Sequence, residues 1–287
     1  MEDAAYRQWT ERVVRALNTV LPYPDVTTWE RCERLVAHAQ ACAGHIAGCG
    51  FLFPEAARLL NQAGYYLVER ARYAEAKPLY QRALAIREQA LGPEHPDVAT
   101  SLNNLALLYK TQGRYAKAEP LHQRALAIDE KALGPEHPDV ATSLNNLAAL
   151  YYAQGQYAKS EPLCERALAI REQALGPEHP HVAQSLNNLA RLYDTQGQYV
   201  KSEPLYQRSL AIREQALGPE HPDVATGLNN LAELYRAQGQ YAKSEPLYQR
   251  ALDIAEKALG PEHPTVATFR KNYAALLRAA GQPLDHR

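Results

Sequence analysis

Apolar residues of the chain recur at the spacing of an α-helix, and one stretch near residue 100 shows the pattern well. Leu102, Leu105, Ala106 and Tyr109 fall at helical spacing and form one apolar stripe. Gly113 follows this stretch, and glycine is the residue that takes the left-handed conformation at a helix end most cheaply. The sequence therefore predicts a helix that stops just before Gly113.

A second amphipathic stretch comes directly after that turn. Its apolar positions are Tyr115, Ala118, Ala125, Leu126 and Ile128. Pro120 should lie near the first turn of this helix, where a missing N–H is tolerated better than in the interior. Gly92-Pro93 closes one such unit, and Pro96 opens the next as a first-turn proline. Because no alternating β-branched runs lie between turn signals, the pattern predicts helix-turn-helix units without strands.

The same unit recurs along most of the chain. The string LGPEHP begins at Leu91, Leu133, Leu175, Leu217 and Leu259, a constant step of 42 residues. Asparagine pairs keep this step, at Asn103-Asn104, Asn145-Asn146, Asn187-Asn188 and Asn229-Asn230. A degenerate earlier copy starts near Arg58, with Asn61-Gln62 at the pair position, and a half-copy after Pro264 has Lys271-Asn272 there. A fixed period of this length is typical of a repeat protein whose neighbouring units share one core.

These residues resemble the tetratricopeptide repeat. Its spaced pattern is matched by Leu105-Ala106, Tyr109, Gly113, Tyr115, Ala118 and Ala125. The longer period and the motifs LNNLA, YxxAEPLxxRALAI and LGPEHPDVA are similar to those of the kinesin light chain subtype, over residues 58–281. The first copy departs from the pattern, because Ala71 replaces the turn glycine and Gln62 the second asparagine. The resemblance implies an all-α fold, a right-handed superhelical solenoid of antiparallel helix pairs.

Three parts are expected along the chain: an N-terminal helical segment at residues 1–54, five repeats at 55–264, and a capping helix with a tail at 265–287. The first part is predicted to hold two helices separated by Pro22 and Pro24. The motif WxxCERLxxHAQAC in this part is similar to the segment that joins the NB-ARC-type ATPase module to its repeats in bacterial signal-transduction ATPases. That resemblance implies a sensor or autoinhibitory arm, although the sequence has no Walker A pattern.

The family pattern also predicts where a ligand would lie. In tetratricopeptide proteins the first helix of each unit lines a concave surface, here at the positions of Thr100, Asn103, Asn104, Leu107, Lys110 and Thr111 and their equivalents. The candidate peptide-binding residues are Asn103, Asn104, Leu107, Lys110, Asn145, Asn146, Tyr152, Asn187, Asn188, Arg191, Asp194, Asn229, Asn230, Glu233, Arg236, Lys271, Asn272 and Arg278.

Differences between the units fall on this surface. Framework positions change little, whereas two positions vary: Leu107 (then Ala149, Arg191, Glu233) and Lys110 (then Tyr152, Asp194, Arg236). Recognition of a ligand would concentrate variation in this way. Drift at exposed sites is the alternative, because Asp129 also becomes Arg171 on the second helix.

The asparagine pairs need an explanation, since an Asn side chain inside a helix competes for backbone hydrogen bonds. A carboxamide has both donor and acceptor, so a row of them can bind the backbone of an extended peptide whatever its sequence. In kinesin-light-chain-like repeats the matching asparagines line the peptide groove. We expect at least one member of each pair, preferentially the second, to contact ligand. The alternative is that one member bonds the backbone of the adjacent repeat.

A group of basic residues gives weaker evidence for a binding site. Lys271, Arg278 and Arg236 gather at the carboxyl end of the surface and could receive a carboxylate. Asp194 and Glu233 lie nearby, which favours ordinary solvated charge as the alternative.

Recurring histidines first suggest a metal ladder, at His95, His137, His179, His221 and His263. Metal ligands lie about 2 Å from one ion, whereas packed helices stand about 8–10 Å apart. These histidines are therefore expected to pack or cap at helix starts. A single helix also cannot wrap four ligands around zinc, which discounts the set His38, Cys42, His45 and Cys49. No metal and no cofactor is predicted.

The charge and composition of the chain argue against nucleic acid and membranes as partners. A formal net charge of −1 gives no long-range attraction to nucleic acid or to an anionic membrane. The sequence has no apolar run long enough to span a bilayer, and its start, MEDAAYRQW, does not read as a secretory signal. A cytoplasmic location with free thiols is therefore expected.

No nucleophile with a His-Asp partner set is visible, so no catalytic residues are assigned. The sequence predicts a non-catalytic scaffold that holds a protein or peptide in the concave groove. The alternative is a sensor or autoinhibitory arm, whose ligand releases an NB-ARC-type ATPase domain in the same or a neighbouring chain.

Overall fold

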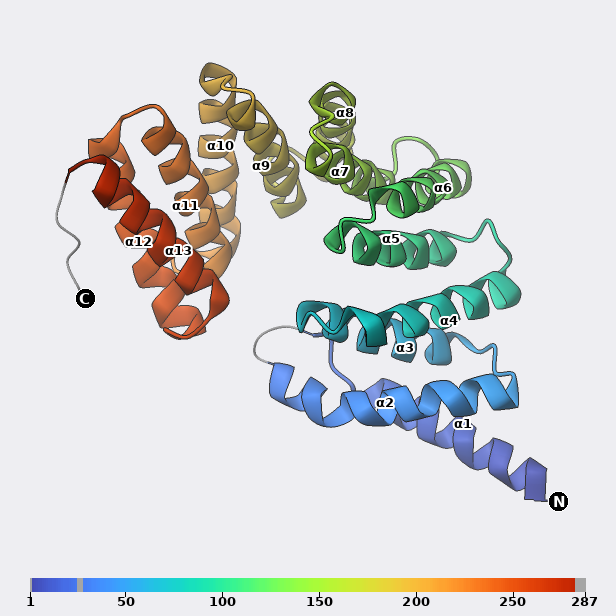
Figure 1. Cartoon of the computed structure of the whole chain (residues 1–287). Coiled ribbons are helices and arrows are strands. Elements are labelled where there is room, and N and C mark those ends of the chain that lie inside the picture. The colour runs from blue at the N-terminus through green and yellow to red at the C-terminus, as the bar shows by residue number, and fades with distance from the viewer. Residues whose placement is uncertain (1, 25–27, 282–287) are drawn as a thin grey trace. The chain divides into compact units, whose positions relative to one another are not determined.

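The computed structural model describes residues 2–24 and 28–281 of the chain (Figure 1). Within these ranges the backbone forms 13 α-helices and no strand, in agreement with the predicted fold class. The chain divides into two compact units, Met1–Leu150 and Tyr151–Arg287. No helix of the described residues has both the length and the apolar character that a bilayer crossing requires.

The first unit begins with the two predicted helices, α1 (Glu2–Val20) and α2 (Trp29–Cys49). They are followed by the pair α3 (Pro54–Glu69) and α4 (Tyr73–Leu91), and by the pair α5 (Pro96–Thr111) and α6 (Tyr115–Leu133). Helix α7 (Pro138–Ala153) begins in this unit and ends in the next. From α1 to α6 each helix packs on the next one in the sequence, and α1 also packs on α3.

Within the second unit, helices that follow one another in the sequence also pack on one another. The unit holds α8 (Tyr157–Leu175), α9 (Pro180–Thr195), α10 (Tyr199–Leu217), α11 (Pro222–Ala237), α12 (Tyr241–Leu259) and α13 (Pro264–Ala279). One apolar cluster of this unit includes Leu228, Leu231 and Leu234 of α11, with Ile254 of α12 and Phe269 of α13. The predicted stripes therefore form the core between helix pairs.

The turn inside each pair requires a left-handed residue, as predicted. Gly113 has a φ of 70°, and glycines with φ near this value stand at the same place in the later repeats. Ala71 stands there in the first repeat and has a φ of 56°. A Cβ is strained in this region, so the first turn carries a conformational cost that the others lack.

The second-helix prolines lie deeper than predicted. Pro120 was expected near the first turn, but α6 begins at Tyr115 and contains Pro120 in its second turn. The helix continues because only one ladder hydrogen bond is lost there. Pro96 is confirmed as a first-turn residue of α5.

The recurring histidines cap helices. The Nδ1 atom of His95 accepts a hydrogen bond from the backbone N–H of Asp97 at 3.1 Å. The other four make the equivalent bond at the starts of α7, α9, α11 and α13. This satisfies one of the N–H groups that a helix start leaves without an intrahelical partner, which confirms the predicted capping role.

Candidate functional site

The first helix of each repeat carries the candidate residues. We call the first-helix surface the exposed or half-buried positions of α3, α5 and the first part of α7 in one unit, and of the end of α7, α9, α11 and α13 in the other. The prediction was wrong for Asn145 and Asn229, which are buried at 7% and 4% exposed. In α5, Asn103, Asn104, Leu107 and Lys110 are half-buried, whereas Leu108 beside them is fully buried. The same framework that forms the core thus holds these side chains at the surface.

Asparagine side chains bond one another between repeats. Nδ2 of Asn104 donates to Oδ1 of Asn61 in the preceding repeat at 2.8 Å. The pair Asn230 and Asn187 does the same at 2.8 Å, and Asn272 with Asn229 at 3.1 Å. The second asparagine of one repeat therefore bonds the first asparagine of the repeat before it. The alternative prediction was that one asparagine of each pair bonds the backbone of the adjacent repeat. In the structure this bond goes to an asparagine side chain of the adjacent repeat.

We call these hydrogen bonds between asparagines of adjacent repeats the asparagine ladder. They leave some donors and acceptors of the carboxamides unused. A carboxamide has two N–H donors and an oxygen with two lone pairs. In the bond between them, Asn230 uses one N–H donor and Asn187 uses one lone pair. Both are half-buried, so groups remain that a ligand could reach.

One repeat breaks the ladder. The Oδ1 atom of Asn103 is 2.8 Å from Nδ1 of His122, and its Nδ2 donates to Oγ of Ser143 at 2.8 Å. Ser143 in turn donates to Oδ2 of Asp129 at 2.6 Å. With Asn103 engaged in this way, Asn146 of α7 is half-buried and its side chain makes no hydrogen bond to the part of the chain that the structure describes.

Burial controls the charge of this network. His122 is 1% exposed, and burial with nearby Lys110 lowers its pKa to about 4. Burial also raises the pKa of Asp129. Sequence reasoning missed the network. Its signal was present, because His122 stands where Tyr80 and Tyr206 stand in other repeats.

The alternative of drift rested on Asp129 and Arg171 being exposed, and this was wrong. Asp129 is 5% exposed and bonds Ser143 of the next repeat. Arg171 is 2% exposed and donates to Oγ of Ser185 at 3.1 Å and to the carbonyl of His181 at 2.8 Å. Variation at this position exchanges one buried polar contact between repeats for another.

In the second unit the variable positions form a mixed polar group. The guanidinium of Arg191 lies 4.6 Å from the ring centroid of Tyr152, and the Tyr152 hydroxyl bonds Oγ1 of Thr195 at 2.7 Å. A cation over an aromatic face is attracted by the ring quadrupole. Residues from α7 and α9 thus build one wall of polar and aromatic character.

Acidic side chains lie further along α9 and α11. Glu233 is 3.9 Å from Arg236 on the next turn. Burial, with a contribution from Glu233, raises the pKa of Asp194 to about 6, and burial raises the pKa of Glu233. The two carboxylates are close enough to interact, and one guanidinium partly compensates them.

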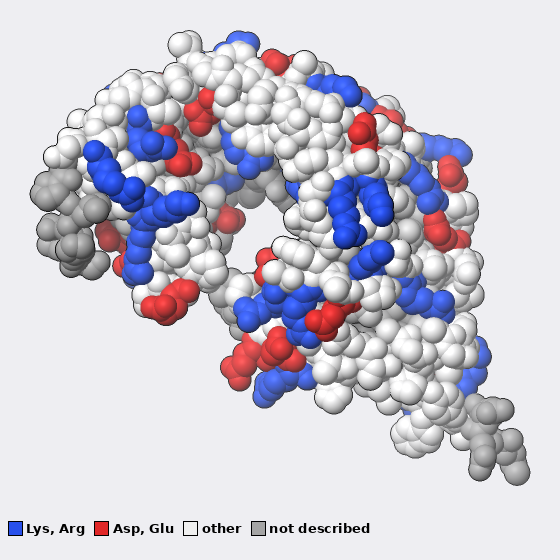
Figure 2. Space-filling model, viewed as in Figure 1, with Lys and Arg blue, Asp and Glu red and all other residues white. Residues whose placement is uncertain are grey.

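The predicted basic cluster at the carboxyl end is mixed in charge. Arg236 is paired with Glu233, while Lys271 and Arg278 of α13 are exposed. Figure 2 shows acidic and basic side chains interspersed over the face in view, which fits the net charge of −1. In the described residues no three His, Cys, Asp or Glu side chains come together as a metal site would require.

This arrangement presents groups that can bind a polypeptide. It offers carboxamides, a cation over a tyrosine and partly compensated carboxylates on rigid helices. Such groups donate and accept hydrogen bonds with a polypeptide.

Comparison with known proteins agrees with the repeat pattern. The tetratricopeptide repeat profile matches residues 55–131, 111–160, 139–215, 195–257 and 223–285. No curated protein sequence matches the chain.

Several solved structures are similar. The nearly identical TPR-like repeats of a putative kinesin light chain from Podosopora anserina are 31% identical, covering 71% of this chain and 97% of that one, with a TM-score of 0.58. BtubC (BKLC) from P. vanneervenii is 26% identical over 89% of this chain and 94% of that one, with a TM-score of 0.61. The PilF structure from Pseudomonas aeruginosa is 19% identical over 80% and 94%, with a TM-score of 0.51, and shows the fold alone.

Proposed function

The chain belongs to the tetratricopeptide repeat family, and from this premise we propose that it is a non-catalytic scaffold that holds a partner polypeptide on its first-helix surface. Repeats of this family are in general scaffolds for protein interaction. The observation that carries the proposal is the contrast along α5, α9 and α11. Leu108, Leu192 and Leu234 are invariant and buried, while the residues immediately before them, Leu107, Arg191 and Glu233, differ between repeats and stay accessible.

Hydrogen bonds to the ligand backbone would supply affinity without demanding one sequence. The carboxamides lie on helices that the inter-repeat ladder holds in place, so little conformational entropy is lost on binding. Asn146 is the member with no competing bond, and we place it against the ligand. Variable neighbours such as Arg191 and Glu233 would then select the side chains that fit.

A binding experiment separates ligand contact from structural support. Partners retained by the immobilised chain are identified by mass spectrometry, and the affinity of a recovered partner is measured for Asn146→Ala and Arg191→Ala. We expect each substitution to weaken binding by about tenfold, the worth of one lost contact of about 1.4 kcal/mol, without lowering the melting temperature. Unchanged affinity in both variants would refute the site. Arg34→Glu, at an exposed position of α2, is the control.

A second candidate function is the sensor or autoinhibitory arm of an NB-ARC-type ATPase. The feature that favours it is the outer face of α1. Tyr6, Trp9, Val13 and Val20 are 51%, 63%, 47% and 39% exposed, and their spacing places them on one stripe that suits packing against another helix. An ATPase domain of the same or a neighbouring chain would cover this stripe.

That candidate has its own test. An NB-ARC sequence in the same genomic reading frame or beside it would support the arm, and the two parts should then copurify. Trp9→Ser should release the ATPase part while leaving ligand binding unchanged. We place either form in the reducing cytoplasm, where buried thiols such as Cys32 and Cys42 stay reduced. A charge of −1 gives no reason to add nucleic acid or membrane as partners.

A further inference from the structure

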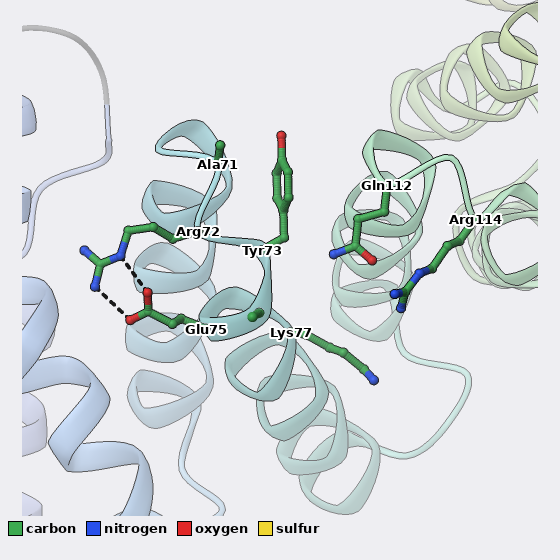
Figure 3. Close-up of a pocket in the computed structure, with 8 residues that line it drawn as sticks. Ala71, Arg72, Tyr73, Glu75, Lys77, Gln112 and Arg114 are labelled. Atoms are coloured by element: carbon green, nitrogen blue, oxygen red, sulfur yellow. Dashed lines mark hydrogen bonds and ion pairs between the residues drawn. The ribbon is translucent and has the colours of Figure 1, made fainter.

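A pocket of about 690 Å³ lies in the first unit, away from the asparagine ladder. It opens where the turn before α4 faces the turn between α5 and α6 (Figure 3). The side chains that matter on its wall are Arg72, Tyr73, Glu75, Lys77, Gln112 and Arg114.

Its charge is unbalanced because only one of the three cations is neutralised. Arg72 holds Glu75 with two hydrogen bonds, Nε to Oε1 at 2.8 Å and Nη2 to Oε2 at 2.7 Å. Gln40 of α2 adds a third bond to Glu75 at 2.8 Å. Lys77 and Arg114 have no ion-pair partner among the described residues, and Figure 3 shows the two side chains extending toward one another.

The later repeats have different residues at the places of Lys77 and Arg114. Lys77 stands where the later repeats have glutamate, at Glu119, Glu161, Glu203 and Glu245. Arg114 stands where three later repeats have glutamine, at Gln156, Gln198 and Gln240. Glu75 is exchanged in the opposite direction, because the later repeats have lysine there, at Lys117, Lys159, Lys201 and Lys243. The pocket between the first two repeats thus differs in holding its two uncompensated positive charges at Lys77 and Arg114, where the next three pairs of repeats have glutamate and glutamine.

The lost glutamate has a structural role elsewhere. In the second unit, Tyr235 donates a hydrogen bond to Oε1 of Glu203 at 2.8 Å. At the equivalent place Tyr109 is 8% exposed, and Lys77 provides no acceptor for it. Its hydroxyl makes no hydrogen bond within the described ranges. The first repeat thus lacks the carboxylate that accepts this tyrosine hydrogen bond in the second unit.

We propose that this pocket binds a carboxylate group supplied by a ligand, held between Lys77 and Arg114. A guanidinium and an ammonium form short, charge-assisted hydrogen bonds to a carboxylate, and the guanidinium can do so with two parallel N–H groups. The source is an acidic side chain of a partner polypeptide or a small dicarboxylic acid. This site is separate from the first-helix surface, so it can bind even if that surface does not.

The test uses two probes and the full chain. Succinate and an acetylated, amidated triglutamate are titrated separately into the 15N-labelled protein, and ¹H–¹⁵N spectra report the affinity. We expect shifts around residues 72–77 and 112–115. Shifts with both probes identify a free acid as sufficient, and shifts with triglutamate alone identify a polypeptide source. No shift with either probe overturns the proposal.

Matched variants locate the binding. Lys77→Glu installs the residue of the later repeats and Arg114→Gln does likewise, so both should fold. Each should weaken probe binding at least tenfold, and Lys77→Glu should also raise the melting temperature, because Tyr109 gains an acceptor. Arg34→Glu changes the net charge as Lys77→Glu does, but lies outside the pocket, and should bind as the parent does. Equal binding by Lys77→Glu, Arg114→Gln and parent would refute the site. Loss of partner binding in Asn146→Ala leaves this result untouched.

Discussion

Nδ2 of Asn230 on α11 donates a hydrogen bond to Oδ1 of Asn187 on α9, at 2.8 Å. The two residues are 43 positions apart, which is one repeat and one residue. Asn104 with Asn61 and Asn272 with Asn229 form the same bond between adjacent repeats, whereas Asn146 does not bond Asn103, which is engaged by His122 and Ser143. This bond explains why a residue that weakens a helix interior is repeated so often. The competition for backbone groups is offset by a contact that aligns adjacent repeats.

Asn230→Ala should therefore destabilise the second unit. It removes the donor and leaves the half-buried Oδ1 of Asn187 without this partner, which costs about 1–2 kcal/mol. Urea unfolding followed by circular dichroism measures the change in the free energy of unfolding. Asn146→Ala is the matched control and should change that free energy by less than about 0.5 kcal/mol. Equal losses in both variants would mean that the ladder bond contributes nothing specific.

His122→Tyr should remove an acid sensitivity of the first unit. The folded pKa of His122 is about 4 against an ordinary value of 6.5. Between pH 6.5 and 4, His122 is therefore protonated in the unfolded chain but neutral in the folded chain. The free energy of unfolding consequently falls as the pH drops through this range. The loss is on the order of 2–3 kcal/mol at pH 4. Tyrosine is the residue of other repeats at this place and does not titrate there.

Melting temperatures of parent and His122→Tyr at pH 7.5 and pH 4.5 provide the check. Asp129 belongs to the same network, and its raised pKa acts in the opposite sense, so the difference between parent and variant is the quantity to compare. We expect the parent to lose more stability on acidification than the variant. Parallel losses would contradict the role of His122, and His38→Tyr at an exposed position is the control.

Ala71→Gly should stabilise the turn between α3 and α4. Ala71 has a φ of 56°, and a residue with a Cβ pays roughly 1 kcal/mol to stay in this region. Glycine at Gly113, Gly155, Gly197 and Gly239 avoids that cost. An increase in the free energy of unfolding by about 0.5–1 kcal/mol is expected. Gly113→Ala is the reciprocal variant and should lose a similar amount; an unchanged value for both would show that the turn relaxes.

The helices followed from the sequence because each depends on local signals that recur. Leu102, Leu105 and Tyr109 mark a face, Pro96 a start and Gly113 an end, and the structure confirms all of them. The contacts of Asn103 could not be predicted this way. Whether its carboxamide bonds Asn146 or His122 depends on which side chain comes within reach across a helix pair, and periodicity carries no such distance.

Asp194→Asn should raise the stability of the second unit at neutral pH. Burial and Glu233 raise the pKa of Asp194 to about 6, whereas an unfolded aspartate titrates near about 3.9. Between these values the folded chain binds more protons than the unfolded chain, so stability falls as pH rises from about 4 to 6 and stays lower above. Asparagine keeps the shape and carries no charge. The melting temperature of the variant should exceed that of the parent at pH 7.5 and approach it at pH 4.5. Asp253→Asn at an exposed position of α12 should show no such pH dependence, and an equal shift in both variants would assign the effect to net charge instead of to the pair on α9 and α11.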